Sequence, residues 1–300
     1  PLSSSASLAP HPRVGVRLSR QVATAPVAVH SPLLPPSAPV PQTAPSARRP
    51  GSQGRPWWDG PAAGWSIATA LAAVAGFVLT AGIGTPSPWA DEGATYLAVQ
   101  RTWQQIAVLW QGRDAPWVPY YYLAKAWSIL LHAVLPGTST LVALRLLSAV
   151  AAAGAVLALY AIIARNAGRI GGIFAALVLV SLPGFSRYAQ EARGYSLLAF
   201  AATVSWLLSD RWLRPGRVAT LTGTSVRRGD GRDGYPSVGA GGAYALGLAA
   251  VAAVHTFGVF QWPAHLVSVL VAPGERHVRA RRVAGFALLG LIAVALAGAQ

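Results

Sequence analysis

Long apolar stretches recur from residue 64 to the end of the chain, and they constrain the fold more than any other feature. Each is 15 to 23 residues long, near the roughly 20 residues that a helix needs to cross a bilayer. The 300 residues have a mean hydropathy of +0.44, and only 11% are charged. The chain is therefore predicted to be all-α, a polytopic transmembrane helical bundle. The predicted spans are 64–84, 117–135, 141–163, 170–186, 194–208, 241–256, 257–271 and 284–299.

The first 60 residues have a different composition, rich in Pro, Ser, Ala and Arg, with Asp59 as their single acid. Such a segment buries too little apolar surface to offset its ordering entropy. We expect residues 1–60 to be a disordered cytoplasmic tail and residues 61–300 to form the membrane domain. A signal peptide is not expected, because the first strongly apolar run begins only near Gly64 and exceeds a typical signal core. The apolar run at Gln300 suggests that the domain is truncated there.

The net charge of +15 is explained better by membrane topology than by nucleic-acid binding. Outside the tail, the arginines gather between apolar runs, at 165–169, 209–235 and 275–282. Positively charged loops face the cytoplasm, so these segments are predicted to lie inside. The acidic clusters then fall near the outer face. Cysteine is absent, which excludes disulfides and thiolate metal sites.

Residues 86–116 join the first two predicted spans and mix apolar, charged and tryptophan side chains. This mixture predicts one or two helices lying in the membrane interface. The next segment, 117–135, makes the number of membrane crossings inconsistent with the charge rule. With the tail and Arg165 both inside, 117–135 and 141–163 cannot both be ordinary crossings. Either 117–135 is re-entrant, or the Arg165 turn breaks the charge rule.

Asp91 and Glu92 are adjacent carboxylates that follow the first apolar run, in a chain with only nine acidic residues. One interpretation is electrostatic, with Ser87 as helix N-cap, Pro88 at the first helical position and both acids facing the positive end of the helix dipole. The other is catalytic, because a carboxylate at the membrane surface is costly and is usually kept for chemistry. Asp91 would then be a general base that activates an acceptor hydroxyl.

Two further stretches place polar side chains at the same predicted outer surface. Asp114 comes shortly before Tyr121 and Tyr122, which suit either interfacial anchoring or substrate contact. The second stretch, Ser-Arg-Tyr-Ala-Gln-Glu-Ala-Arg-Gly-Tyr, lies between two apolar runs. Its candidate site residues are Gln190, Glu191, Arg193 and Tyr195.

The second stretch has two interpretations. Arg187 and Glu191 are four residues apart and could pair across one helical turn. Alternatively, an arginine here holds a phosphate, for which its planar guanidinium is well suited. His255 also has two interpretations. A histidine at the end of an apolar run serves either in packing or in proton transfer and metal binding. The chain has no Walker-type glycine loop and no His-Glu-x-x-His motif.

In chain order the motifs are Trp-x-Asp-Glu-Gly-x-Thr, Asp-x-x-x-x-x-Tyr-Tyr, Ser-Arg-Tyr-Ala-Gln-Glu-Ala-Arg-x-Tyr-Ser-Leu and His-x-Phe. This order resembles the polyprenyl-phosphate-sugar-dependent glycosyltransferases of the GT-C superfamily. The resemblance is to the family 39 group related to protein O-mannosyltransferases and aminoarabinose transferases, including actinobacterial mannosyltransferases. It covers residues 64–300. Members commonly carry a histidine just before the paired tyrosines, where this chain has Trp117 or Val118.

The resemblance implies a cell-membrane enzyme that moves mannose or a similar sugar from a polyprenyl-phosphate donor to a lipid, glycan or protein hydroxyl at the outer face. Asp91 would be the catalytic acid-base residue, with Glu92 beside it. The remaining candidates would hold the donor or line its cavity: Asp114, Tyr121, Tyr122, Gln190, Glu191, Arg193, Tyr195 and His255. A divalent metal would be a possible cofactor. A transporter or flippase of a lipid-linked sugar is the alternative, and a structural scaffold leaves the outer carboxylates unexplained.

Overall fold

The computed structural model describes residues 61–214, 217–219, 225–227, 238–272 and 276–298. The expected tail, 1–60, lies outside the described residues. The described part belongs to one compact unit and is helical, except for a short antiparallel pair, β1 (Arg217–Ala219) and β2 (Ser225–Arg227). The all-α expectation is confirmed for this part. Its longer helices are α1 (Pro61–Thr80), α2 (Ala90–Gln100), α4 (Val118–Val134), α5 (Thr140–Ser181), α7 (Tyr195–Leu213), α8 (Val238–Val254), α9 (Gln261–Val271) and α10 (Arg276–Gly298).

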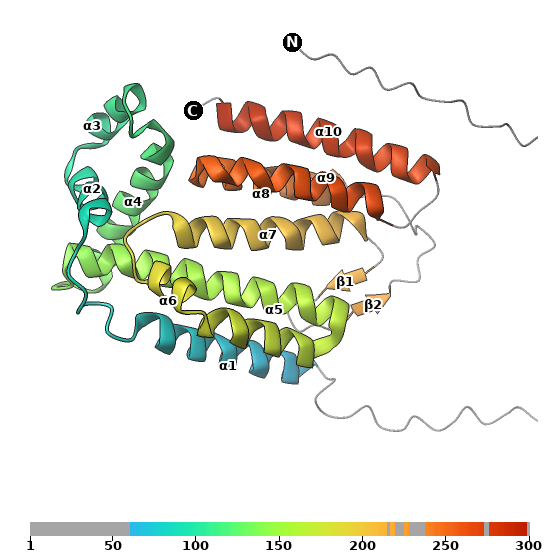
Figure 1. Ribbon diagram of the computed structural model, residues 1–300, viewed down its shortest axis with the longest axis horizontal. Coiled ribbons are helices and arrows are strands. Elements are labelled where there is room, and N and C mark those ends of the chain that lie inside the picture. Colours follow the sequence, from blue (N-terminus) through green and yellow to red (C-terminus); the bar gives the residue numbers. More distant parts are fainter. Residues whose placement is uncertain (1–60, 215–216, 220–224, 228–237, 273–275, 299–300) are drawn as a thin grey trace, which may run out of the picture. The chain divides into compact units, whose positions relative to one another are not determined.

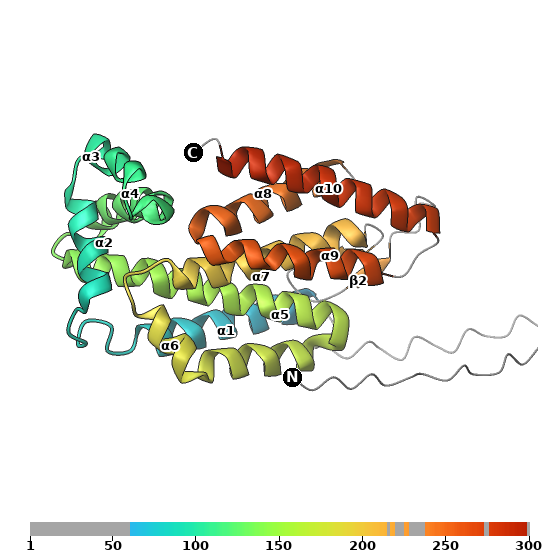
Figure 2. The same cartoon turned by 45° about the horizontal axis from the view of Figure 1, so that its top comes forward.

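Five helices lie side by side in the order α1, α5, α7, α8, α10, and α9 packs against α10 and α7 (Figures 1 and 2). Two apolar clusters hold this bundle together. One joins α1 to α5 around Leu79 and Tyr160, and the other joins α7 to α8, α9 and α10 around Trp212 and Tyr244. Leu79, Tyr160 and Tyr244 have at most 1% of their surface exposed. Burial of such large side chains is the main favourable term in the packing.

The long helix α5 is two antiparallel segments joined at Gly168. Gly168 has φ 82° and ψ 165°, a conformation that is essentially restricted to glycine. A Cβ atom on Gly172 would lie 2.9 Å from the Tyr160 carbonyl oxygen and from Ala164 Cβ, so the second segment folds back on the first. The predicted turn at 165–169 is therefore present. The second segment ends at Ser181, before Pro183, rather than at 186.

The stretch between α1 and α5 forms a separate helical layer. Helices were expected within 86–116, whereas 117–135 was predicted to be a span or a re-entrant segment. It contains α2, α3 (Trp103–Val108), two single turns, η2 (Leu109–Gln111) and η3 (Ala115–Trp117), and then α4. These elements lie at the end of the bundle where α5 begins, and α4 lies across that end (Figures 1 and 2). Their core includes Ile106, Tyr120 and Tyr121 and packs against the first part of α5. The layer places the first acidic cluster beside the loop before α7.

Several predicted boundaries were wrong. The helix that carries Asp91 is capped by Trp89, without a side-chain hydrogen bond, so Ser87 and Pro88 lie before it. Helix α7 continues to Leu213, five residues beyond the prediction. Residues 276–282 were expected to be a loop but form the first turns of α10. The 257–271 span is divided into a 3-10 helix, η4 (Thr256–Phe260), and α9. These misses concern helix ends, which carry little signal in a sequence.

Two helices in the described residues are long and apolar enough to cross a membrane, by length and composition. They are Ala62–Thr80 and Thr140–Ser181, and the shorter apolar helices are Gly239–Val254 and Phe257–Val271. The segment of α5 before Gly168 is by itself about 40 Å long, at about 1.5 Å per residue. This segment alone is therefore long enough to cross a bilayer.

Candidate active site

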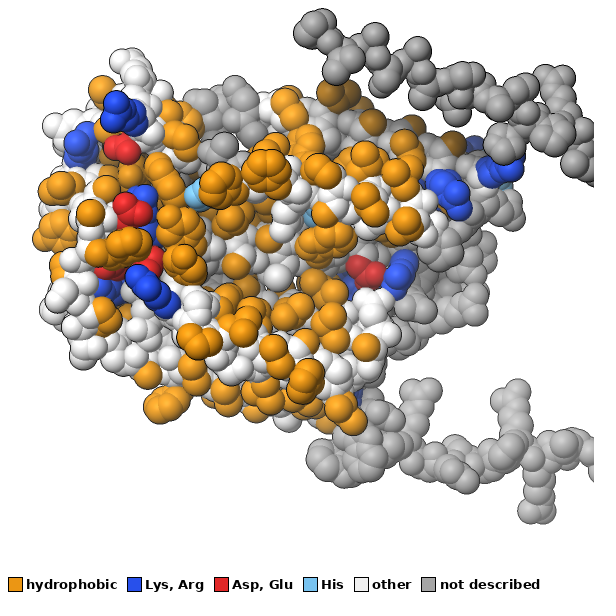
Figure 3. Space-filling model, in the orientation of Figure 1, with side chains coloured by type: hydrophobic (Ala, Val, Ile, Leu, Met, Phe, Trp, Pro, Cys, Tyr) orange, Lys and Arg blue, Asp and Glu red, His pale blue; other side chains and the backbone are white. Residues whose placement is uncertain are grey.

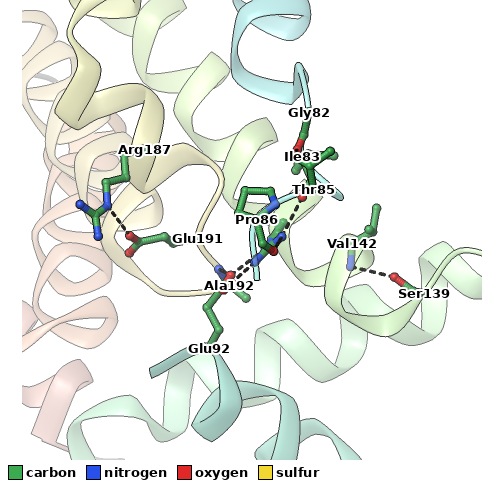
Figure 4. A network of polar contacts seen from close by, with 11 residues as sticks. Gly82, Ile83, Thr85, Pro86, Glu92, Ser139, Val142, Arg187, Glu191 and Ala192 are labelled. Carbon is green, nitrogen blue, oxygen red and sulfur yellow. Dashed lines mark hydrogen bonds and ion pairs between the residues drawn. The ribbon is translucent and has the colours of Figure 1, made fainter. Parts of the chain in front are cut away.

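Glu92 and Arg145 form the buried ion pair that organises this region. Each has 1% of its side chain exposed. The guanidinium Nε and Nη2 donate to the two carboxylate oxygens, at 2.8 and 2.7 Å. Nη1 of Arg145 also donates to the carbonyls of Ile83 and Pro86, and the backbone N–H of Ala192 donates to Glu92. The pair thus joins the loop after α1, helix α2, helix α5 and the loop before α7 (Figure 4).

The electrostatics of Glu92 indicate an ionised structural carboxylate. Burial raises its pKa, but the hydrogen bonds from Arg145 and from the Ala192 and Trp89 backbones, with the charge of Arg145, lower the pKa below the ordinary 4.5. Both oxygens accept hydrogen bonds in this bidentate arrangement, which is the strongest that arginine makes. Glu92 is thus better placed to position α2 than to accept a proton from a substrate.

Asp91, one residue earlier, has the opposite environment. Its side chain is 43% exposed, and its Oδ2 lies 3.5 Å from Nη2 of Arg193, whose own side chain is only 7% exposed. Arg193 lies over the ring of Trp117, with its guanidinium carbon 4.1 Å from the ring centroid. Among the described residues, Nε and Nη1 of Arg193 have no hydrogen-bond partner within 3.5 Å, although the buried Tyr121 hydroxyl is close enough to interact with the guanidinium. Because buried donors without partners are costly, this guanidinium is suited to receive an anion.

An aromatic wall and further carboxylates surround Arg193. The ring of Trp117 meets those of Tyr195 and His255 edge to face, at centroid distances of 6.1 and 4.7 Å. Nδ1 of His255 accepts a hydrogen bond from the Phe257 backbone N–H, so the ring proton of the neutral form is on Nε2. Tyr121 is buried within electrostatic reach of Asp114, Arg193 and Asp91. The structure therefore brings these predicted residues together around one guanidinium.

Glu191 lies at the margin of the same group. Its Oε1 accepts a hydrogen bond from Arg187 at 3.3 Å, and the Arg187 side chain is 73% exposed (Figure 4). The predicted pairing across one turn is therefore present. Burial raises the pKa of Glu191, against the opposing effect of Arg187. Its second oxygen, Oε2, is buried and has no hydrogen-bond partner among the described residues.

Two predicted site residues point elsewhere. Tyr122 stacks on Trp103 of α3 with ring centroids 5.9 Å apart, and its hydroxyl donates to the Trp103 carbonyl. Gln190 donates from Nε2 to the carbonyl of Ala81, just after α1. Both connect secondary-structure elements and do not face Arg193.

Sequence reasoning did not single out Arg145. The available signal was an arginine inside an otherwise uncharged apolar run, since a buried charge in such a setting needs a partner. The possible divalent metal remains a prediction. In the part of the chain that the structure describes, no three His, Cys, Asp or Glu side chains are grouped so that they could hold a metal ion.

We compared the chain with protein-family models, with curated proteins and with solved structures, and none of the three comparisons gave a match.

Proposed function

We propose that this chain is a polytopic membrane glycosyltransferase. It would move a sugar from a polyprenyl-phosphate donor to an acceptor hydroxyl at the outer face, with Asp91 as the base. One observation carries the proposal. Arg193 is a buried guanidinium with two hydrogen-bond donors unengaged among the described residues, and it lies directly beside a solvent-exposed carboxylate. Phosphate recognition and proton acceptance are the two functions that such a transfer requires.

The distribution of charge supports a membrane setting. The uncharged stretches include all of α1 and α8, residues 146–164 of α5 and residues 195–209 of α7. Large apolar side chains such as Phe77, Ile170 and Phe174 are 70 to 85% exposed. Figure 3 shows an apolar face between two separate groups of charged side chains. Such exposure is unusual for a surface in water and suits hydrocarbon.

The position of α4 supports a consistent topology. Because α4 lies across the end of the bundle with α2 and α3 (Figure 1), it need not count as a crossing, as in the re-entrant interpretation. With α1 crossing outward, the arginines near Gly168, Leu213 and Arg276 then all fall inside, in agreement with the positive-inside rule. Asp91 and Arg193 fall outside.

In the proposed reaction, Arg193 binds the phosphate that carries the sugar. It uses Nε and Nη1 and relinquishes its weak contact with Asp91. The freed carboxylate of Asp91 takes the proton of the acceptor hydroxyl. The hydroxyl oxygen bonds to the anomeric carbon from the side opposite the phosphate, the carbon–oxygen bond to phosphate breaks, and the configuration inverts. Negative charge that develops on the leaving phosphate is stabilised by a cation already held in place.

The remaining residues position these two groups. The Glu92 and Arg145 pair fixes the first turn of α2, and with it Asp91, against the loop that carries Arg193. The ring of Trp117 orients the guanidinium by a cation–π contact. Tyr195 and His255 complete an aromatic wall that could face a sugar ring.

The test is transfer of radiolabelled sugar from polyprenyl-phosphate-mannose and its arabinose analogue, in membranes that contain the full-length protein. Asp91→Asn is expected to lower the turnover rate at least 100-fold, as loss of a general base does. Arg193→Gln should weaken both donor binding and turnover. Arg187→Gln, in the neighbouring helix α6 (Pro183–Ala189) and with a side chain that is 73% exposed, is the matched control. Full activity of Asp91→Asn would exclude the mechanism. Donor binding with lipid movement but no transfer would favour the flippase alternative.

A further inference from the structure

A cavity lies at the other end of α7, away from Arg193. Its volume is about 500 Å³, and it is bounded by α5, α7, α9 and α10. Asp210, on its border, is 15 residues after Tyr195 on the same helix, which is about 22 Å at about 1.5 Å per residue. The cavity is therefore separate from the candidate active site and lies at the end that the proposed topology puts inside.

The lining divides into an apolar interior and a polar rim. Leu159, Ile162, Trp206 and Val271 contribute apolar surface. The charged and amide side chains of the lining are Asn166, Asp210, Arg214 and Arg282, the last of which is largely buried and donates to the Leu213 carbonyl. A volume of this size is within the range of about 300 to 1,000 Å³ that is typical of ligand sites. The helix beside it, α9, exposes Val271 to 73% and Leu270 to 45%. The surroundings of the cavity are thus apolar, and an occupant with a hydrocarbon part fits better than a water-soluble metabolite.

The rim is built around Asp210. Its Oδ2 pairs with Arg165 at 3.0 Å and its Oδ1 with Arg214 at 3.3 Å. Arg214 also donates to the side-chain oxygen of Asn166. These contacts hold the guanidinium of Arg214 in one place while 45% of its side chain remains exposed. Because the carboxylate is already shared between two arginines, the accessible charge at the rim is the cationic Arg214.

We propose that this cavity binds one anionic phospholipid, with the phosphate at Arg214 and an acyl chain along Trp206. Charge complementarity selects an anionic headgroup, since a fixed and exposed guanidinium pairs with phosphate oxygens. The apolar interior selects a lipid over free phosphate. This inference depends on the membrane insertion proposed above and is independent of sugar transfer. A lipid held there would brace α5, α7, α9 and α10 against one another at the inner surface.

Trp206 provides a direct readout. Bromine atoms on an acyl chain quench tryptophan fluorescence on contact, so purified full-length protein in detergent is titrated with brominated phosphatidylglycerol. Because the chain has 11 tryptophans, the expected result is a saturable component of the quenching that Trp206→Phe removes. Unbrominated phosphatidylglycerol should reverse it at least fivefold more effectively than phosphatidylcholine. Glycerol phosphate, which lacks acyl chains, should not reverse it. Equal competition by phosphatidylcholine, or reversal by glycerol phosphate, would overturn the proposal.

Two substitutions separate specific binding from a general charge effect. Arg214→Gln should weaken competition by phosphatidylglycerol about tenfold, since a charge-assisted hydrogen bond is lost. Arg211→Gln removes the same charge from an exposed position of α7 that does not line the cavity, and it should change nothing. Equal effects of the two variants would show nonspecific attraction and contradict the site. The wild-type competition series remains decisive even if a variant fails to fold.

Discussion

At the scale of single residues, two adjacent carboxylates have separate roles because their neighbours differ. Glu92 is enclosed and has a bidentate partner in Arg145, whereas Asp91 is half exposed and has only a 3.5 Å contact with Arg193. Because successive residues of a helix are rotated by about 100°, α2 points the two side chains in different directions. The same dipeptide thus supplies one structural group and one group that is available for chemistry.

We expect Arg145→Ala to destabilise the protein by about 3 to 5 kcal/mol, because it leaves the Glu92 carboxylate buried without a partner. Thermal unfolding in detergent measures this, with Arg187→Ala as control. The control breaks an ion pair whose arginine is 73% exposed, although its partner Glu191 is only 8% exposed. Because water reaches one side of this pair, we expect a smaller loss than at the fully enclosed pair. Similar losses in both variants would contradict the structural role of the Glu92 pair.

Acid should weaken the same pair. The folded-state pKa of Glu92 is held below the ordinary 4.5, mainly by Arg145 acting against burial. Its stabilising contribution is complete above 4.5 and is lost as the pH falls through the lower folded value. Unfolding midpoints measured across this acidic range should therefore fall more steeply for wild type than for Glu92→Leu with Arg145→Met. If the unfolding midpoints of wild type and the double variant changed in parallel with pH, the proposed link between Glu92 protonation and stability would be wrong.

At the scale of elements, Gly168 decides that α5 is a hairpin and not one continuous rod. Its φ of 82° allows the chain to reverse, and Gly172 then lets the two segments approach closely. This reversal places the loop before α7 beside α2. The candidate site therefore depends on a backbone conformation in a distant turn.

Gly168→Ala is expected to cost about 1 to 3 kcal/mol, the usual penalty for a side chain in such a conformation. Gly184→Ala in α6 (Pro183–Ala189) is the matched control, because a Cβ there meets nothing within 4 Å and its φ is not positive. That control should be neutral or slightly stabilising. Unfolding of both variants by denaturant tests the difference, and unchanged stability of Gly168→Ala would be inconsistent with the reversal.

At the scale of the whole molecule, an uncharged middle separates two charged ends, each with its own arrangement of arginine and carboxylate. Asp91, Glu92, Asp114 and Glu191 gather at the end bearing the candidate active site, and Asp210 lies at the end bearing the cavity. This polarity is what the proposed multi-pass membrane bundle would require.

The absence of cysteine from the sequence makes this polarity easy to test. A single cysteine at exposed Gln111 should react with an impermeant maleimide added to intact cells. A single cysteine at exposed Ala167 should react only after the membrane is opened. Labelling of both positions from the same side would contradict the proposed topology.

The helical class, the main helices and the turn near Gly168 were predictable from the sequence, because apolar runs and arginine clusters are local patterns. Most of the residues that gather around Arg193 were also indicated there. Which of these residues meet depends on tertiary packing. Arg145 lies 53 positions from Glu92 and Ala192 lies 100, and no local pattern specifies contacts across such separations. Packing at the end of the bundle, not residue type, buried Glu92, exposed Asp91 and turned Tyr122 toward α3.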